Sequence, residues 1–305
     1  MQAPHPGPAP CTVDSGTELL GSGASARVSR ARLTESLADL EVGTPVALKR
    51  AALDDSAGRA ALTREIDLLG SIEHEGLLTL LAHGEDDAGP WLILPLLEGP
   101  TLAECVEAGG MPEPELRALG LRLTRALMAL HDQGHVHGDV KPENVRFDSA
   151  GNAYLLDLGF AAPIGSPFSE RGTPGYLPPE YLAGAQWGPS GDLFALGVTL
   201  YQAATGEHPC PAALELGSEN AIIEAFSRRD ARRPSRRAAS LSPAMDHWLA
   251  SALDPNPDVR PSLSRSVEFF QSPPPWIGTR KNLRTNPWSS AIRLPLVGRE
   301  SELTE

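Results

Sequence analysis

The sequence predicts an α+β fold in which short strands come first and helices follow. Brief apolar runs bounded by turn residues predict strands over residues 20–28, 46–49, 77–83 and 91–96. Leucines that recur every three or four residues predict a long helix over residues 113–133. A chain of 305 residues is long enough to bury one large core or two small ones.

The composition and the charge indicate a soluble globular protein. Hydrophobic residues make up 41% and charged residues 21% of the chain, and no apolar run reaches the ~18 residues of a membrane helix. The first ten residues contain four prolines and no lysine or arginine, unlike a signal peptide. The net charge of −13 argues against nucleic acid as a partner. Three cysteines without close spacing argue against a disulfide framework or a zinc site and favour the cytoplasm.

The start of the chain combines a flexible composition with a glycine-rich turn. Residues 1–16 are rich in proline, alanine and glycine, which predicts a disordered tail, and order should begin near Thr17. Gly21, Ser22 and Gly23 then form the turn of a predicted strand–turn–strand segment. Because glycine has no Cβ, backbone amides in such a turn can approach a phosphate closely. An ordinary hairpin turn has the same pattern, so both interpretations stay open at this segment.

A lysine ends the next predicted strand, Val46–Lys49. The following predicted helix, Gly58–Gly70, carries Glu65 beside its apolar stripe, from where the carboxylate can reach back to Lys49. An ion pair between the two side chains would hold the lysine extended. The alternative for Glu65 is a solvated charge on the face of the helix.

The most informative stretch contains Asp139, Lys141 and Asn144, and Asp157 follows it closely. Transfer of a terminal phosphoryl group from ATP needs these types of group. One carboxylate accepts the proton of the attacking hydroxyl, an amide and a second carboxylate hold Mg²⁺, and an ammonium offsets charge on the moving phosphoryl. The stretch therefore predicts a catalytic loop for phosphoryl transfer.

Lysine is rare in this chain, which makes its positions informative. Only Lys49, Lys141 and Lys281 occur, whereas the 26 basic residues are otherwise arginine. Two of the three lysines coincide with lysine positions of the family resemblance described below, where a compact ammonium can reach phosphate as a point charge. The alternative is a pair of ordinary surface lysines.

The second half of the chain adds a long irregular segment and a buried helix. Residues 157–180 are rich in glycine, proline and serine and are too long for a simple connection. Asp192 precedes an apolar predicted helix over residues 193–205, where the helix dipole stabilises a carboxylate. The arginine-rich residues 228–237 predict either a solvated face or a docking patch.

At His137–Asn144 and Asp157–Gly159 the chain resembles the eukaryotic-like, bacterial-type Ser/Thr protein kinase family. The family pattern is His-Arg-Asp and then Asn, followed by Asp-Phe-Gly, and here Gly138 stands at the arginine and Leu158 at the phenylalanine. The resemblance implies a two-lobed protein-kinase-like fold with ATP between the lobes. The domain would cover residues 17–271, with a small β-rich N-lobe over about 17–97 and a larger helical C-lobe over about 98–271.

The resemblance also implies a set of nucleotide contacts in the N-lobe. Lys49, held by Glu65, would bind the α- and β-phosphates, and Val28 would cover the adenine ring. Leu94 would lie behind the adenine, and the backbone amide of Leu97 would bind it. The implied nucleotide-binding residues are Leu20, Gly21, Ser22, Gly23, Val28, Ala47, Lys49, Glu65, Leu94 and Leu97.

The implied C-lobe residues include the catalytic Asp139 and Lys141 and the metal ligands Asn144 and Asp157. The segment that ends at Pro-Pro-Glu resembles a kinase activation segment. Within it, Thr173 would hydrogen-bond the catalytic aspartate and lysine. Three more implied residues are structural: Asp192 would anchor the backbone of the catalytic loop, and Arg260 would pair with Glu180.

The function that the resemblance implies is transfer of the γ-phosphoryl of Mg²⁺-ATP to Ser or Thr hydroxyls of protein substrates in bacterial-type signalling. The chain's own activation segment is a candidate target, and neither nucleic acid nor a membrane is expected as a partner. Two alternatives remain. One is a pseudokinase, a regulatory nucleotide-binding module. The other is a small-molecule phosphotransferase of the same fold, a class that generally lacks a lysine equivalent to Lys141 and the Pro-Pro-Glu segment.

The C-terminal end differs in composition from the rest of the chain. Residues 272–305 are rich in proline and arginine and predict a linker. Within them, residues 294–303 resemble the opening of AAA-type or STAND-type NTPase domains, although the chain has no phosphate-binding loop of the Gly-x4-Gly-Lys type.

Overall fold

The chain divides into two compact units. The N-unit comprises Met1–Leu97 with Leu156–Ala161, and the C-unit comprises Glu98–Leu155 with Ala162–Glu305. The return segment Leu156–Ala161 corrects the sequence assignment, which placed it in the C-lobe, because its polar groups bond to side chains of the N-unit. The computed structural model describes residues 4–5, 9–13, 19–22, 26–37, 39–51, 54–169, 172–216, 218–227, 233–238 and 241–272.

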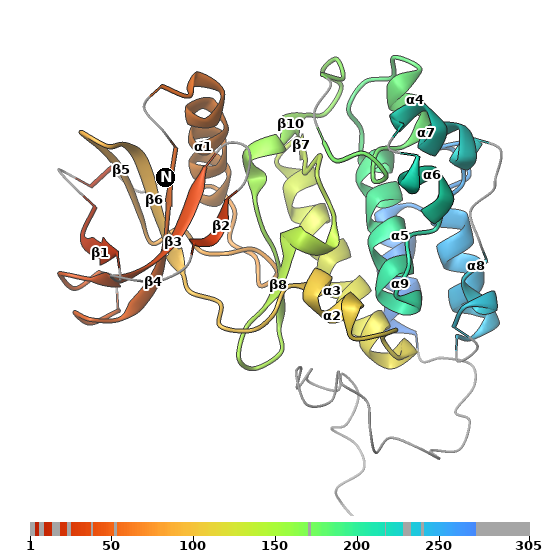
Figure 1. The fold of residues 1–305 in the computed structure, drawn as a ribbon, viewed down its shortest axis with the longest axis horizontal. Helices are drawn as coiled ribbons and strands as arrows, with labels where there is room; N and C mark the ends of the chain where they lie inside the picture. Colours follow the sequence, from red (N-terminus) through yellow and green to blue (C-terminus); the bar gives the residue numbers. More distant parts are fainter. Residues whose placement is uncertain are drawn as a thin grey trace, which may run out of the picture. The chain divides into compact units, whose positions relative to one another are not determined.

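The N-unit contains an antiparallel sheet with the strand order β1-β3-β4-β6-β5, and β2 also pairs with β3 (Figure 1). Helix α1 (Ser56–Leu69) packs against β6. Asp55 caps its first turn by accepting a hydrogen bond from the backbone N–H of Gly58 at 2.8 Å. The strands are β1 (Cys11–Val13), β2 (Leu19–Ser22), β3 (Arg27–Leu33), β4 (Pro45–Arg50), β5 (Ala82–Asp86) and β6 (Gly89–Pro95).

Successive side chains of β4 point to opposite faces of the sheet, so one face packs in the core and the other carries Lys49. Val46 and Leu48 lie in the apolar core cluster of one face. Ala47 and Lys49, the alternate residues, therefore point to the other face, which α1 covers in part. One strand thus supplies core packing and a candidate site residue at the same time.

Two predictions for the N-unit are wrong in part. The expected disordered tail over residues 1–16 contains β1, because Cys11 packs on the core cluster and residues 11–13 pair with an edge of β3. The strand expected over residues 77–83 begins instead at Ala82. Leu77, Leu78 and Leu80 are all buried rather than alternating, so this segment does not have strand periodicity.

The C-unit is mainly helical (Figure 1). Its helices are α2 (Leu102–Glu107), α3 (Glu113–Asp132), α4 (Pro179–Leu182), α5 (Pro189–Thr205), α6 (Pro211–Glu215), α7 (Glu219–Ser227), α8 (Pro243–Ala252) and α9 (Leu263–Gln271). Two small antiparallel sheets pair β7 (His135–Val136) with β10 (Ala162–Pro163) and β8 (Val145–Phe147) with β9 (Ala153–Leu155). The 3₁₀ turns are η1 (Pro142–Asn144) and η3 (Pro234–Arg236) in this unit and η2 (Leu158–Phe160) in the N-unit.

Helices α3 and α5 form the core against which the loops of the C-unit are set. The predicted leucine stripe of α3 is buried throughout, and α3 packs on both α5 and α9. Helix α5 is buried on almost every side, which explains why its sequence is apolar in an unbroken run. Its first turn carries Asp192, so this buried helix presents a carboxylate at its N-terminus.

Candidate active site

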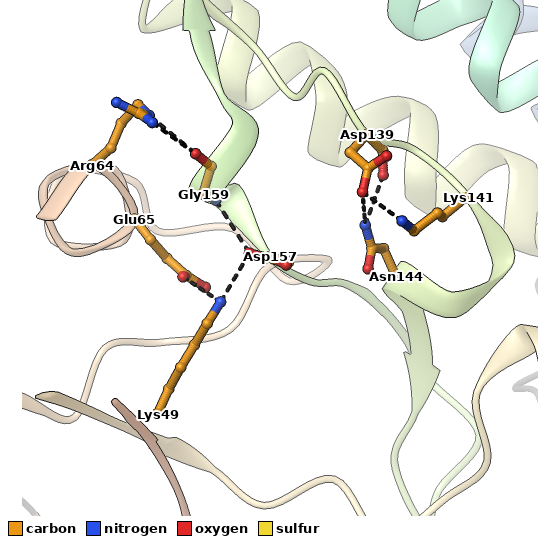
Figure 2. A network of polar contacts seen from close by, with 8 residues as sticks. All are labelled: Lys49, Arg64, Glu65, Asp139, Lys141, Asn144, Asp157 and Gly159. Carbon is orange, nitrogen blue, oxygen red and sulfur yellow. Dashed lines mark hydrogen bonds and ion pairs between the residues drawn. The ribbon is translucent and has the colours of Figure 1, made fainter. Parts of the chain in front are cut away.

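Lys49 is the centre of the polar network in the N-unit. Its Nζ donates to Oε2 of Glu65 at 2.5 Å and to Oδ1 of Asp157 at 2.9 Å (Figure 2). The ion pair predicted between Lys49 and Glu65 is therefore present, and Asp157 adds a second carboxylate. Strand β4, helix α1 and the return segment each contribute one of the three side chains.

The charge state of Lys49 follows from this environment. Burial alone would lower its pKa, but the carboxylates of Glu65 and Asp157 more than offset that effect and hold the pKa above its usual range. Lys49 is therefore a fixed ammonium at neutral pH. A charged, oriented ammonium of this kind is suited to binding phosphate oxygens.

Asp157 is held in an unusual backbone conformation. Its φ of +63° makes it the one non-glycine residue with positive φ in the described part of the chain. Its Oδ1 accepts a hydrogen bond from the backbone N–H of Gly159 at 3.3 Å, and Arg64 of α1 donates to the Gly159 carbonyl at 2.9 and 3.2 Å (Figure 2). Such a conformation costs about 1–3 kcal/mol and persists only where the surroundings fix it. Here, Lys49 of β4 holds the Asp157 side chain and Arg64 of α1 holds the Gly159 carbonyl.

The other implied nucleotide contacts share the sheet face of Lys49. In the strand register, Val28 lies opposite Lys49, and Ala47 lies opposite Leu94. Directly paired residues, and residues two apart on a strand, point to the same face, so these four side chains form one surface. Leu97 is buried just after β6. Of the glycine-rich turn, Leu20, Gly21 and Ser22 lie in β2, whereas Gly23 falls outside the described residues.

Asp139 is the centre of the polar network in the C-unit. Its Oδ1 accepts a hydrogen bond from the hydroxyl of Thr173 at 2.6 Å, and its Oδ2 pairs with Nζ of Lys141 at 2.8 Å. The side-chain amide of Asn144 donates to the same Oδ2 at 2.9 Å and to the backbone carbonyl of Asp139 at 2.8 Å (Figure 2). Lys141 also donates to the Thr173 hydroxyl at 2.6 Å. The predicted contacts of Thr173 with the aspartate and the lysine are thus both present.

A buried carboxylate anchors the loop that carries Asp139. Asp192 accepts hydrogen bonds from the backbone N–H groups of His137 at 2.8 Å and Gly138 at 3.0 Å, as predicted, and from Nε2 of His131 at 2.7 Å. Burial would raise the pKa of Asp192, but these donors outweigh it and hold the pKa below its usual value. Gly138 has a φ of +78°, a conformation that glycine adopts without strain.

We expect Asp192→Asn to destabilise this loop. The amide would present N–H groups to the backbone N–H donors that the carboxylate now satisfies, at a cost of about 1–3 kcal/mol for each buried donor left without an acceptor. Urea unfolding should show a lower free energy of unfolding, and Asp258→Asn, at an exposed position, serves as the control. Equal stability of the two variants would contradict an anchoring role for Asp192.

A second ion pair predicted from the sequence joins the end of the activation segment to the chain before α9. The guanidinium of Arg260 binds the carboxylate of Glu180 through two hydrogen bonds, at 2.6 and 2.8 Å. Arg260 also donates to three backbone carbonyls and stacks on the ring of Phe194 at 4.8 Å. Its pairing end is fully buried, so the interaction is shielded from solvent.

We expect Arg260→Ala to lower the free energy of unfolding by about 3–5 kcal/mol, because it leaves the Glu180 carboxylate without its partner in a largely buried place. Arg260→Lys should recover only part of this loss, since a lysine cannot form the paired hydrogen bonds or the ring stack. Chemical denaturation measures both, and Arg265→Ala at an exposed position of α9 is the matched control. A loss no larger than that of the control would exclude this stabilising role.

An aromatic cluster that the sequence did not predict holds the activation segment. Phe168 stacks on Tyr181 and packs at a tilt on Trp187, with ring centroids 5.0 Å apart in both cases. The backbone N–H of Trp187 donates to the Ser166 carbonyl at 3.0 Å, and Gly165 donates to the Trp187 carbonyl at 2.8 Å. The middle of the segment is therefore fixed by ring packing and backbone hydrogen bonds.

Comparison with known proteins identifies the domain. A family model described as "Protein kinase domain" matches residues 15–271. The chain belongs to the protein kinase family. The α+β, two-lobed fold class predicted from the sequence is therefore confirmed.

The kinase domain is similar to serine/threonine kinases of bacteria and eukaryotes. The serine/threonine-protein kinase PknL of Mycobacterium tuberculosis is 32% identical over 233 residues, which cover 73% of this chain and 57% of PknL. The hormonally up-regulated neu tumor-associated kinase homolog A of Xenopus laevis is 31% identical over 74% of this chain and 33% of its own. The Schizosaccharomyces pombe kinase shk1/pak1 is 27% identical over 83% of this chain and 37% of its own.

The matches cover only part of each relative's length. The kinase domain matches about half the length of PknL and about a third of the two eukaryotic relatives. Family membership implies the use of ATP and a divalent metal ion. The resemblance of residues 294–303 to an NTPase domain lies outside both the matched and the described residues and has no support from the matches. No helix in the described part of the chain is long and apolar enough to span a bilayer.

Proposed function

We propose that this kinase domain is catalytically active and transfers the γ-phosphoryl of Mg²⁺-ATP to Ser or Thr hydroxyls of proteins. The observation that carries the proposal is the set of contacts at Asp139. An aliphatic hydroxyl, that of Thr173, already lies within 2.6 Å of both the Asp139 carboxylate and the Lys141 ammonium. The chemistry of these two groups thus suits the hydroxyl of a substrate Ser or Thr.

Each residue of the C-unit network has a distinct role in this proposal. Asp139 orients the substrate hydroxyl and accepts its proton as the oxygen attacks phosphorus. Lys141 places a positive charge beside the transferring phosphoryl group. Asn144 fixes the Asp139 carboxylate through its amide N–H and so holds the base in one rotamer. Most of the rate gain would come from positioning and electrostatic stabilisation.

The N-unit network supplies the nucleotide contacts. Lys49 is held as a charged ammonium by two carboxylates, and the sheet face around it carries Val28, Ala47 and Leu94. We propose that Lys49 binds the α- and β-phosphates, while the apolar side chains of this face contact the adenine ring. Leu97 would bind adenine through its backbone amide.

Two oxygen-bearing side chains fit the metal that accompanies ATP. Asn144 donates two hydrogen bonds to Asp139 from its Nδ2, which turns the amide oxygen away from Asp139, and Asp157 keeps about a third of its side chain exposed. Among the described residues, no three or more His, Cys, Asp or Glu side chains cluster as a metal site. Mg²⁺ suits ligands of these two types, because it takes one or two protein oxygens together with phosphate oxygens and water. When bound, it would neutralise charge on the phosphates.

Phosphate incorporation tests the proposal directly. The purified chain is incubated with Mg²⁺-ATP and a basic protein substrate, and the products are mapped by mass spectrometry. We expect phosphoserine or phosphothreonine on the substrate that is absent with Asp139→Asn. ATP binding without incorporation would favour a pseudokinase instead, and incorporation only into hydroxyl-bearing small molecules would favour a small-molecule phosphotransferase.

We expect that phosphorylation of the activation segment does not switch the activity on through residue 138. Gly138 has no side chain to pair with a phosphate, and the Phe168 ring contacts already fix the segment. Ser166→Glu and Ser169→Glu should each change kcat by less than about twofold, compared with Ser166→Gln and Ser169→Gln. Steady-state assays of protein treated with phosphatase measure this, and strong activation by either glutamate would refute it. Thr173→Glu should not activate either, since Thr173 is bonded to Asp139.

A further inference from the structure

His208 lies in the C-unit between α5 and α6, and its ring joins two backbone segments. Nδ1 accepts a hydrogen bond from the backbone N–H of Cys210 at 3.0 Å, so this nitrogen carries no proton. Nε2 therefore carries the proton and donates to the Gly175 carbonyl at 3.0 Å. Burial keeps the pKa of His208 below its usual value, which favours this neutral form.

The Gly175 carbonyl belongs to the turn that presents Thr173. The backbone N–H of Tyr176 donates to the Thr173 carbonyl at 3.1 Å and closes a turn over Thr173–Tyr176. Gly175 is buried and has a φ of +94°, and a Cβ built on it would lie 3.1 Å from Nε2 of His208. The imidazole is thus packed directly against the turn.

Neighbouring side chains leave the ring little freedom. The rings of Tyr176 and Phe226 meet His208 edge-on, with centroids 6.0 Å away in each case. The Tyr176 hydroxyl donates to Gln202 of α5 at 2.7 Å, so the turn is tied to the central helix on its other side.

We propose that His208 is a positioning residue for phosphoryl transfer, since its hydrogen bond to Gly175 fixes the turn that holds the Thr173 hydroxyl on Asp139. This inference rests on the proposed kinase activity. The path consists of three contacts: His208 to the Gly175 carbonyl, the closed turn to Thr173, and Thr173 to Oδ1 of Asp139. None of these three contacts joins His208 directly to Asp139 or Lys141, so His208 acts through the turn.

Two amide variants separate the two hydrogen bonds of the ring. In His208→Gln, the side-chain amide occupies the place of Nε2 and can still donate to the Gly175 carbonyl. In His208→Asn, the side-chain oxygen occupies the place of Nδ1, so it can still accept from Cys210 but cannot reach Gly175. We expect kcat to fall about tenfold in the Asn variant and less than about threefold in the Gln variant, as for one lost hydrogen bond. The KM for ATP should stay unchanged in both, since the proposed nucleotide contacts lie in the N-unit.

If His208 had a purely structural role, kcat would be lower in the Gln variant than in the Asn variant, or equal in the two, because only the Asn variant preserves the bond to Cys210. Equal kcat in the two variants, with an active wild type, would overturn the role of His208 alone. An inactive wild type would overturn the proposed kinase activity instead. In that case, hydrogen exchange at the Tyr176 amide still tests the positioning, because exchange should be about tenfold faster in the Asn variant than in the Gln variant. Equal exchange rates would exclude it.

Discussion

Replacing Asp139 by asparagine should lower kcat by about 10²–10⁴-fold, the usual contribution of a positioned general base. The amide cannot take up the hydroxyl proton, and it leaves the Lys141 ammonium without its carboxylate partner at 2.8 Å. The KM for ATP should change little, because the proposed phosphate contacts belong to a separate network around Lys49. Initial-rate kinetics with a phosphorylated-peptide readout measures both constants.

The matched control is Asp132→Asn, which makes the same chemical change at an exposed position at the end of α3. It should keep wild-type kinetics. Thermal unfolding of Asp139→Asn measures the accompanying loss of stability: the oxygen of asparagine can still accept from Thr173, but its amide N–H groups would face the Lys141 and Asn144 donors that Oδ2 now satisfies. Retention of more than about a tenth of the wild-type kcat would argue that another group accepts the proton.

Replacing Lys49 by methionine should lower kcat/KM for ATP by about 10²–10³-fold, as expected when a preorganised charged donor is removed. Methionine keeps the bulk of the lysine stem but leaves two carboxylates, those of Glu65 and Asp157, without a cation. Lys49→Arg tests geometry rather than charge, since a broad guanidinium replaces a compact ammonium. Its activity should fall between those of wild type and Lys49→Met.

A double-mutant cycle isolates the role of Glu65. If Glu65 acts by holding Lys49, Glu65→Gln should reduce kcat/KM in the wild-type background but add little once Lys49 is methionine. Fully additive losses would show that Glu65 acts independently of Lys49. Titration with Mg²⁺-ATP by calorimetry separates a loss of nucleotide affinity from a loss in the chemical step.

The contacts that could be predicted from the sequence are those between residues that belong to recognisable kinase motifs. The pairs Lys49–Glu65 and Glu180–Arg260 are both present. Opposite charges in an apolar setting have few other ways to be satisfied once the fold is known. The roles assigned to these residues in binding and catalysis stay predictions until kinetics test them.

Other contacts could not be predicted, because they depend on how helices pack. His131 reaches Asp192 from α3, and Arg64 reaches the Gly159 carbonyl from α1. Glu113 and Arg117 form a buried ion pair whose carboxylate also binds Ser242. Spacing of four residues on one helix was the only signal for that pair, and the same spacing is common among exposed charges.

The strand at Cys11–Val13 shows a different limit of sequence reasoning. The composition around it is that of a tail, and three residues are too few to give a periodic pattern. The strand forms because β3 offers backbone groups along its edge and the nearby core can bury Cys11. Local composition is thus overridden by a partner that is distant in sequence.

The rarity of lysine has a consequence for the chemical reactivity of this protein. Acylation of an amine requires its unprotonated form, and the two carboxylates around Lys49 keep that form scarce at neutral pH. Lys141 is likewise engaged, with Asp139 and Thr173. The third lysine, Lys281, lies beyond the described residues. Reagents and enzymes that acylate lysine side chains therefore have three targets in this chain, and two of them are the proposed phosphate-handling groups.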